Sequence, residues 1–221
     1  MSETPKHIAI IGGHGNIALK LTRILADQGS YVTSFIRKAE QSDDIEAAGG
    51  TPLVADVETL SPEDFAEHLT GQQAVVFAAG AGGGDADRTY AVDRDAAIAT
   101  VNAARTSGAS RFVMLSYFGA GPNHGVPSDN AFFPYAEAKA AADAYLSGAP
   151  GLDWTIVAPS ALTDDEGTAT IDAEASEAAK VPRADVAAVI AAVLADPSTV
   201  GRTISFNSGS TPIVEAIAAT A

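Results

Sequence analysis

Residues 8–18 read Ile-Ala-Ile-Ile-Gly-Gly-His-Gly-Asn-Ile-Ala and carry the most informative pattern in the chain. A short aliphatic run ends at Gly12, Gly15 and Ala18 follow at three-residue intervals, and an amphipathic stretch then begins. This spacing predicts a strand, a tight glycine turn and a helix, because glycines let a diphosphate approach the backbone closely. The N–H groups and positive dipole end of the helix would bind that diphosphate. An ordinary tight turn that binds nothing has the same pattern, so both interpretations stay open.

Short apolar runs alternate with helical patterns along the rest of the chain. The runs are rich in Val, Ile and Ala without period-two alternation, which is typical of strands buried on both faces. The repeated strand–helix order predicts an α/β fold, a doubly wound parallel sheet with helices on both faces. The expected strands are 7–11, 31–36, 51–55, 74–78, 111–115, 153–157 and 202–206, and the expected helices are 17–28, 62–69, 87–107, 135–147 and 184–195.

Length and composition suit one domain. The 221 residues, 47% of them hydrophobic, can bury a sizeable core. We expect a single domain over 1–221, in which residues from about 158 to 221 contribute a small C-terminal lobe. Two segments break the strand–helix rhythm. Residues 119–133 form a turn-rich loop, and residues 162–182 read as a hairpin, a short helix or a mobile segment.

Charge and cysteine content exclude several classes of function. The formal net charge is −15 and the 13 Lys and Arg residues are scattered, so we expect no nucleic-acid partner. The absence of cysteine excludes thiolate catalysis, and the four histidines share no metal-ligand spacing, so no metal site is expected. No run approaches the ~18 apolar residues of a membrane span. The first residues lack the build of a signal peptide, so we expect a cytoplasmic protein that does not bind membranes.

The end of the second expected strand bears on which dinucleotide would bind. NAD-binding proteins usually place an acid there for the ribose 2′-hydroxyl. Here Arg37 and Lys38 follow the strand instead. The planar guanidinium of Arg37 suits a 2′-phosphate, and His14 could lie near the same phosphate, so NADP is favoured over NAD. Arg37 and Lys38 would equally suit the solvated start of the next helix.

The ends of the third and fourth strands supply further candidates. Asp56, which precedes Val57, could cap a helix or accept a hydrogen bond from the adenine amino group. The small residues Ala78, Ala79 and Gly80 would let the cofactor ribose lie against the backbone. The cofactor-binding residues predicted so far are Gly12, Gly13, His14, Gly15, Asn16, Ile17, Arg37, Asp56, Val57, Ala78, Ala79 and Gly80.

A phenol and an ammonium group lie one helical turn apart in Tyr135-Ala136-Glu137-Ala138-Lys139. A nearby cation lowers the pKa of a tyrosine, which prepares it to exchange a proton with a substrate hydroxyl or carbonyl. The lysine can also bind the nicotinamide ribose. Because this spacing arises by chance on many helices, the pair alone does not establish a catalytic site.

The order of these motifs along the chain resembles that of the short-chain dehydrogenase/reductase superfamily. The similarity is greater to its atypical, NmrA-like and NAD(P)H-binding branch, which is related to the NAD-dependent epimerases/dehydratases, and it spans nearly the whole chain. Besides the motifs above, it is carried by Asp93 and by segments 111–116, 153–159 and 183–187.

This resemblance implies a Rossmann-like sheet, a bound NAD(P) and a small-molecule substrate. It assigns Tyr135 as the acid/base and Lys139 as its partner, and it implies that Arg183 and Asp185 fix the C-terminal lobe. It also places a further set of residues near the nicotinamide, namely Pro159, Ser160, Ala161 and Leu162.

One pair departs from the family pattern. Ser116 fills the first place of the pair after the fifth strand, and Tyr117 fills the place where active relatives carry Ser or Thr to polarise the carbonyl. Either the substrate sits differently, or Ser116 takes over this role, or the chemistry is weak or absent. In an active enzyme, Ser116 or Tyr117 would orient the substrate oxygen. Ala158 also stands where many relatives have an arginine before the proline.

Three functional hypotheses follow. The first is an NADP-dependent oxidoreductase that transfers a hydride between nicotinamide and a small carbonyl or alcohol substrate. The second is a non-catalytic NAD(P)-binding redox sensor or regulator of NmrA type, which the Tyr117 departure motivates. The third, ranked lowest, is a sugar-nucleotide epimerase, because little chain follows the expected tyrosine–lysine helix to form a sugar-nucleotide pocket. The sequence predicts neither the substrate nor the oligomeric state.

Overall fold

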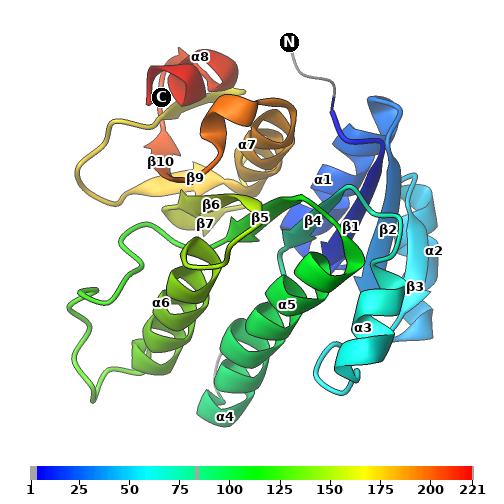
Figure 1. Cartoon of the computed structure of the whole chain (residues 1–221). Helices are drawn as coiled ribbons and strands as arrows, with labels where there is room; N and C mark the ends of the chain where they lie inside the picture. The colour runs from blue at the N-terminus through cyan, green and yellow to red at the C-terminus, as the bar shows by residue number, and fades with distance from the viewer. Residues whose placement is uncertain (1–3, 83–84, 221) are drawn as a thin grey trace.

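A central sheet with helices on both faces forms the fold in the computed structural model, which describes residues 4–82 and 85–220 (Figure 1). Within these residues nine strands form one sheet, in the order β11-β8-β10-β6-β5-β4-β1-β2-β3, and β7 pairs with β9 in a second, small sheet. The strands are β1 His7–Ile11, β2 Tyr31–Ile36, β3 Thr51–Val54, β4 Ala74–Phe77, β5 Arg111–Leu115, β6 Asp153–Pro159, β7 Ala161–Thr163, β8 Thr170–Asp172, β9 Lys180–Pro182, β10 Arg202–Ser208 and β11 Thr211–Pro212. The helices are α1 Asn16–Asp27, α2 Ser42–Ala47, α3 Pro62–His68, α4 Ala86–Thr89, α5 Ala97–Ser107, α6 Phe133–Ser147, α7 Arg183–Ala195 and α8 Ile213–Ala219, with short 3₁₀ turns η1 Ala39–Gln41 and η3 Pro197–Thr199 and a π-helix η2 Tyr90–Ala96.

The sheet confirms the predicted doubly wound architecture. The seven strands from β3 to β10 in the sheet order run parallel, whereas β8 and β11 add an antiparallel edge beyond β10. Strand β1 pairs with β2 on one side and with β4 on the other, so Ile8 stands opposite both Val32 and Ala74. The strand order reverses at this point, and the carboxyl ends of β1 and β4 therefore border the crevice where such folds bind ligands.

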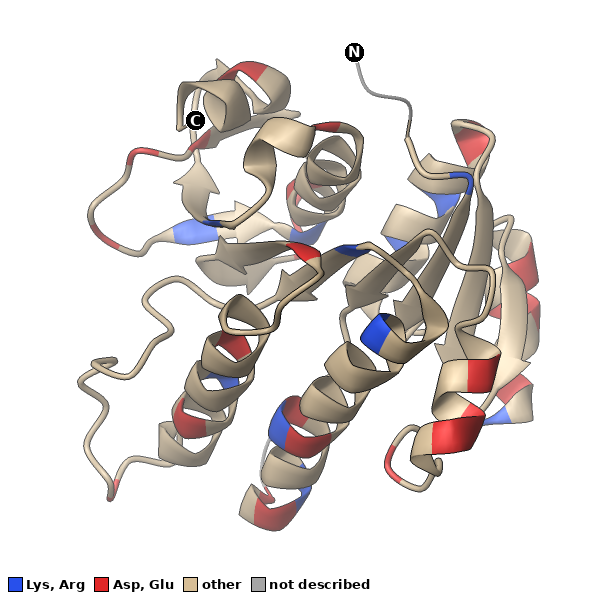
Figure 2. Ribbon diagram, in the orientation of Figure 1, with Lys and Arg blue, Asp and Glu red and all other residues tan. Residues whose placement is uncertain are grey.

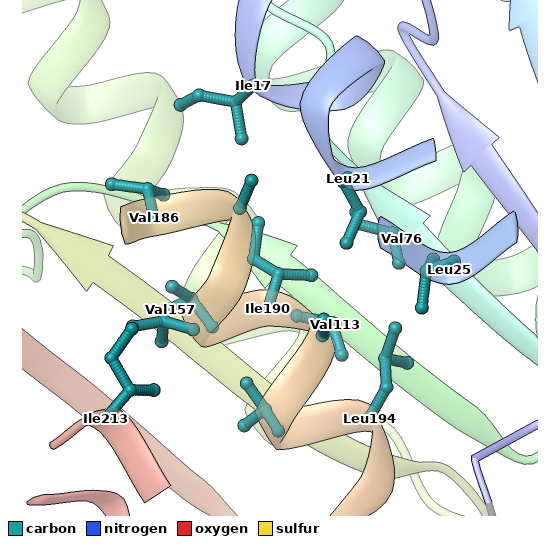
Figure 3. Close-up of a cluster of buried hydrophobic side chains, with 14 of the residues drawn as sticks. Ile17, Leu21, Leu25, Val76, Val113, Val157, Val186, Ile190, Leu194 and Ile213 are labelled. Atoms are coloured by element: carbon teal, nitrogen blue, oxygen red, sulfur yellow. The ribbon is translucent and has the colours of Figure 1, made fainter. Parts of the chain in front are cut away.

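Two apolar clusters hold the helices to the sheet. Helices α1 and α7 cover one face, where Leu21 and Ile190 pack with Val76 and Val113 of the strands (Figure 3). Helices α3, α5 and α6 cover the other face, and Phe77 belongs to the cluster there. Because the strands are buried on both faces, their sequences lack polar alternation.

The expected helix over 87–107 is three pieces in the structure. Helix α4 passes into the π-helix η2, which leads into α5. A π-helix accommodates an extra residue per turn, and such segments occur often at functional sites. Here it carries Asp93, a carboxylate with 1% exposure, toward the interior.

The two segments that break the rhythm have different structures. Residues 119–133 remain a loop until α6 begins at Phe133. The segment over 162–182 contains the short strands β7, β8 and β9 rather than a helix. Within the described ranges, no helix combines the length and apolar character needed to cross a membrane.

Two side chains at the start of α7 fix the preceding loop, as the sequence analysis predicted. Asp185 accepts hydrogen bonds from the N–H groups of Thr168 at 2.9 Å and Ala169 at 2.8 Å, and from the Thr168 hydroxyl. Arg183 Nη1 donates to Asp164 Oδ1 at 2.8 Å. Buried Asp185 therefore contributes more to stability than the exposed Asp164.

Replacement of Asp185 by alanine tests this difference. Asp185→Ala leaves two backbone N–H groups without their acceptor, so we expect the free energy of unfolding to fall by about 2 kcal/mol. Asp164→Ala, which breaks only the exposed pair, should change it by less than about 0.5 kcal/mol. Urea unfolding of both variants measures the difference, and equal losses would contradict the assigned role of Asp185.

Candidate functional site

The glycine turn after β1 is required by close packing against neighbouring strand ends. Gly12 has φ +81°, and a Cβ there would lie 2.5 Å from the Cα of Ala79. A Cβ on Gly13 would lie 2.5 Å from the Cβ of Ser34. Gly15 donates its N–H to the carbonyl oxygen of Gly12 at 3.0 Å, which closes the turn. Helix α1 starts directly after this turn, and no side chain caps it.

The first turn of α1 borders a cavity of about 710 Å³. Gly15, Asn16 and Ile17 form one side of the cavity, the segment 78–80 after β4 forms its floor, and Tyr135 and Lys139 of α6 also line it. First-turn amides have no intrahelical acceptor, so this wall offers N–H donors at the positive end of the helix dipole. Three motifs far apart in the sequence thus meet around one space.

A second cavity of about 400 Å³ continues past the glycine turn, with Gly12, Gly15 and the segment 78–80 in its wall. The predicted residues His14, Arg37, Asp56 and Val57 all line it. Gly13 lines neither cavity, and its role is the close contact with β2. The wall also contains three polar or charged residues that were not predicted from the sequence, namely Gln41, Glu58 and Arg88.

Two arginines share one carboxylate in this second cavity. Glu58 Oε1 lies 3.8 Å from Arg37 Nη1 and 3.6 Å from Arg88 Nη2. Arg88 also donates from Nη1 to the carbonyl oxygen of Ala81 at 3.2 Å. Asp and Glu residues occur throughout the fold with the fewer Lys and Arg scattered among them, so this pair of guanidinium groups is a local exception (Figure 2).

Asp56 and His14 have partners within the protein. Asp56 Oδ1 accepts the N–H of Glu58 at 3.1 Å, so of the two expected roles its carboxylate performs a capping one, at a turn rather than at a helix. The Nε2 atom of His14 lies 2.7 Å from Asp44 Oδ2. His14 therefore already pairs with a carboxylate beside the cavity that Arg37 lines.

Lys139 is buried, and two carboxylates act on it electrostatically. Its ammonium group donates to the carbonyl oxygen of Leu115 at 2.6 Å, at the end of β5. Burial lowers the pKa of Lys139, against the opposing fields of Asp143 and Asp93. Burial also raises the pKa of Asp93 and of Asp143, and Asp93 accepts the N–H of Ala81 at 3.0 Å. Asp93 thus links the cavity floor to Lys139, a role that its place in a helical pattern did not reveal.

Burial, rather than a neighbouring cation, dominates the electrostatics of Tyr135. Desolvation raises the pKa of the Tyr135 phenol, and Asp93, Asp143 and Tyr117 raise it further. The expected lowering of this pKa by Lys139 is therefore not found. The phenol stays protonated at neutral pH, and none of the hydrogen bonds among the described residues involves its hydroxyl.

Asp143 interacts with both Ser116 and Tyr117. The Ser116 hydroxyl donates to Asp143 Oδ2 at 2.5 Å. The Tyr117 hydroxyl is buried without a partner among the described residues, and burial together with Asp143 raises its pKa. The structure thus gives the Ser116 proton a partner inside the protein and leaves Tyr117 as an unused donor.

A third cavity of about 540 Å³ adjoins the first across Leu115, Tyr135 and Leu162. Ser116 and Tyr117 line it from the end of β5. The residues that the family resemblance placed near the nicotinamide, Pro159, Ser160, Ala161 and Leu162, also line it, and Phe118 donates its N–H to the carbonyl oxygen of Pro159 at 2.8 Å. The three cavities form one groove along the carboxyl edge of the sheet.

The fold and this groove define a Rossmann-like protein with a nucleotide-sized crevice at the strand-order reversal. Residues 12–197 match the family model described as NAD(P)H-binding, and the chain belongs to that family. It is 36% identical to YhfK of Bacillus subtilis, named an uncharacterized sugar epimerase, over 95% of this chain and 98% of that one.

Two solved structures are similar over nearly their whole length. A Bacillus halodurans protein provisionally assigned to the NAD-dependent epimerases/dehydratases is 32% identical with a TM-score of 0.88, covering 97% of this chain and 99% of that one. The oxidoreductase ylbE from Lactococcus lactis is 30% identical with a TM-score of 0.85, covering 96% and 95%. These findings confirm the predicted fold class and the resemblance to NAD(P)H-binding proteins related to the epimerases/dehydratases.

Proposed function

We propose that the protein is an NADP-dependent oxidoreductase acting on a small carbonyl or alcohol substrate. The observation that carries this proposal is the cavity in which the amides of the α1 N-terminus face Tyr135 and Lys139. Membership of the NAD(P)H-binding family and the similarity to an oxidoreductase support it.

The groups that line the first cavity fit a dinucleotide. The amides of Asn16 and Ile17 suit its diphosphate, the small residues 78–80 leave room for a ribose, and Lys139 lines the same space. When bound, the cofactor supplies or accepts the hydride. The chain's own part is to hold the substrate and to move a proton at its oxygen.

Tyr135 is the residue to move that proton. Its raised pKa keeps the phenol protonated at neutral pH, so it can donate to a carbonyl oxygen on which negative charge develops. The fields of Asp93 and Asp143 disfavour the phenolate, so Tyr135 would act as the proton donor when a carbonyl is reduced. Lys139 partly offsets these two charges from its site beside Leu115.

NADP is the proposed cofactor because of the cations in the second cavity. Arg37 and Arg88 flank one carboxylate there, and no acid directly follows β2. A 2′-phosphate would compete with Glu58 for both guanidinium groups, and bidentate pairing with phosphate is the strength of arginine.

Arg37→Ala tests the cofactor preference. We expect the dissociation constant for NADPH to rise about tenfold, since a charge-assisted hydrogen bond is lost, and that for NADH to change less than about twofold. Calorimetric titration measures both constants. Lys38→Ala is the matched control, because it removes the same charge from a neighbour outside the cavity wall. Equal weakening of NADPH and NADH by Arg37→Ala would refute the phosphate role.

A non-catalytic NAD(P) sensor is the second candidate. It is favoured by the engagement of the Ser116 hydroxyl with Asp143 and by Tyr117 standing in the place where active relatives carry Ser or Thr. A third candidate, sugar-nucleotide epimerase, has the name of the Bacillus subtilis relative as its support.

One set of measurements separates the three candidates. Calorimetry with NADPH tests binding, consumption of NADPH with a panel of carbonyl compounds tests reduction, and conversion of UDP-galactose tests epimerisation. The oxidoreductase predicts binding and NADPH consumption. Binding without any turnover indicates the sensor, and failure to bind NADPH or NADH at millimolar concentration would overturn the whole proposal.

A further inference from the structure

Three aromatic rings meet at the wall of the third cavity. The ring centroids of Tyr117, Phe132 and Tyr135 lie 5.1 to 5.6 Å apart in all three pairings. Phe132 is 43% exposed and Leu162 across the cavity is 38% exposed, although both are large and apolar. Exposed apolar side chains gathered at one concave site mark a place that binds apolar groups.

The polar groups of this wall are few. Within the described residues no charged side chain lines the third cavity. Ser116 donates to Asp143, and Ser160 donates to Asn207 while accepting the N–H of Ala179 at 3.2 Å. The two serines are thus already bonded within the protein, whereas neither the Tyr117 nor the Tyr135 hydroxyl has a hydrogen-bond partner among the described residues.

We infer that the substrate is an uncharged carbonyl compound with an aromatic or branched apolar body, bound in the third cavity with its oxygen toward Tyr135. This inference rests on the proposed oxidoreductase function. A polyol or a sugar nucleotide would lose its hydration against this wall without replacement hydrogen bonds or counter-charges. An apolar body gains from the same burial, and a single carbonyl oxygen needs no more than the two free phenolic donors, Tyr117 and Tyr135.

Matched pairs of ligands test the inference. With NADPH, we expect kcat/KM for benzaldehyde to exceed that for glyceraldehyde by about 100-fold, the range that one apolar group can supply in a fitted pocket. With the protein alone, saturation-transfer NMR should detect benzyl alcohol and not glycerol. This second measurement needs neither turnover nor cofactor.

Two wall variants locate the binding site. Phe132→Ala should lower kcat/KM for benzaldehyde about tenfold and that for glyceraldehyde less than about twofold, and it should weaken the NMR signal of benzyl alcohol. Leu162→Asn, on an exposed strand position, should act in the same direction and guards against misfolding of the first variant. Val214→Ala is the control, because Val214 is 69% exposed on α8 and lines none of the cavities described.

The outcomes separate this inference from the proposed function. Faster reduction of glyceraldehyde, or equal losses for both aldehydes in the wall variants, overturns the inference and leaves the oxidoreductase intact. Conversion of UDP-galactose overturns both. If no carbonyl is reduced, the proposed oxidoreductase function is wrong. Binding of benzyl alcohol that is lost in both wall variants would then still support an apolar site. If benzyl alcohol does not bind, the inference of an apolar substrate site is overturned.

Discussion

Replacing Tyr135 with phenylalanine is expected to lower kcat/KM for carbonyl reduction by about 10²- to 10⁴-fold, the usual contribution of a positioned proton donor. The change removes one hydroxyl whose hydrogen bonds involve no described residue, so the fold should be preserved. The phenylalanine ring keeps the contacts with Tyr117 and Phe132. Stopped-flow or steady-state consumption of NADPH measures the loss.

The design separates proton transfer from binding. The dissociation constant for NADPH should stay within about twofold of the wild-type value, because the hydroxyl does not carry the diphosphate. Tyr145→Phe is the matched control: it removes a phenolic hydroxyl from the same helix, one that donates to Asn102 at 2.8 Å outside the groove. Retained turnover in Tyr135→Phe would show that another group, with Tyr117 the first candidate, supplies the proton.

Arg111→Met is expected to give the largest loss of stability, about 3 kcal/mol or more. Arg111 is buried at the start of β5 and donates to the carbonyl oxygens of Asp153 at 2.6 Å and Val193 at 2.8 Å. It also donates to the hydroxyls of Thr155 at 2.8 Å and Thr199 at 2.9 Å. Burial lowers the pKa of Arg111 to about 10, which still leaves it charged at neutral pH.

The expected loss of stability is large because Arg111→Met leaves several hydrogen-bond acceptors without their donor. Methionine fills a similar volume but donates nothing, so the groups on β6, α7 and η3 lose their shared donor inside the protein. Urea unfolding measures the loss. Arg105→Met provides the comparison, since exposed Arg105 donates to one carbonyl oxygen, that of Pro150, and should cost less than about 1 kcal/mol. Similar losses for both variants would contradict the bridging role of Arg111.

Much of the fold could be predicted from local patterns. Every expected strand is present and begins at the expected residue, and the expected helices other than 87–107 agree within one or two residues at each end. Buried parallel strands and amphipathic helices have hydrophobic patterns that can be recognised directly in the sequence. The π-helix and the antiparallel edge of β8 and β11 could not be predicted, because they depend on packing between distant segments.

The candidate site divides in the same way. The glycine turn, Arg37, Tyr135 and Lys139 can be predicted from their spacing in the sequence. All of these residues line the groove except Gly13. Arg88 and Glu58 were missed because they occupy unremarkable positions in polar segments. Their signal is spatial, since only the crossing from β4 to α4 brings Arg88 beside the residues that follow β2 and β3.

Local residue patterns suffice to predict the strand–turn–helix unit, the parallel sheet and the resemblance to dinucleotide-binding proteins, because these depend on residue types at fixed short spacings. Three features follow from tertiary packing, namely the burial that raises the pKa of Tyr135, the partner of Ser116 and the apolar lining of the third cavity. Those properties depend on how deeply a group is buried and on which charges lie across from it. Asp93 reaches Tyr135 and Lys139 only because η2 packs against α6, and no spacing along the chain records that contact. Asp143, by contrast, follows Lys139 by four residues on α6 itself.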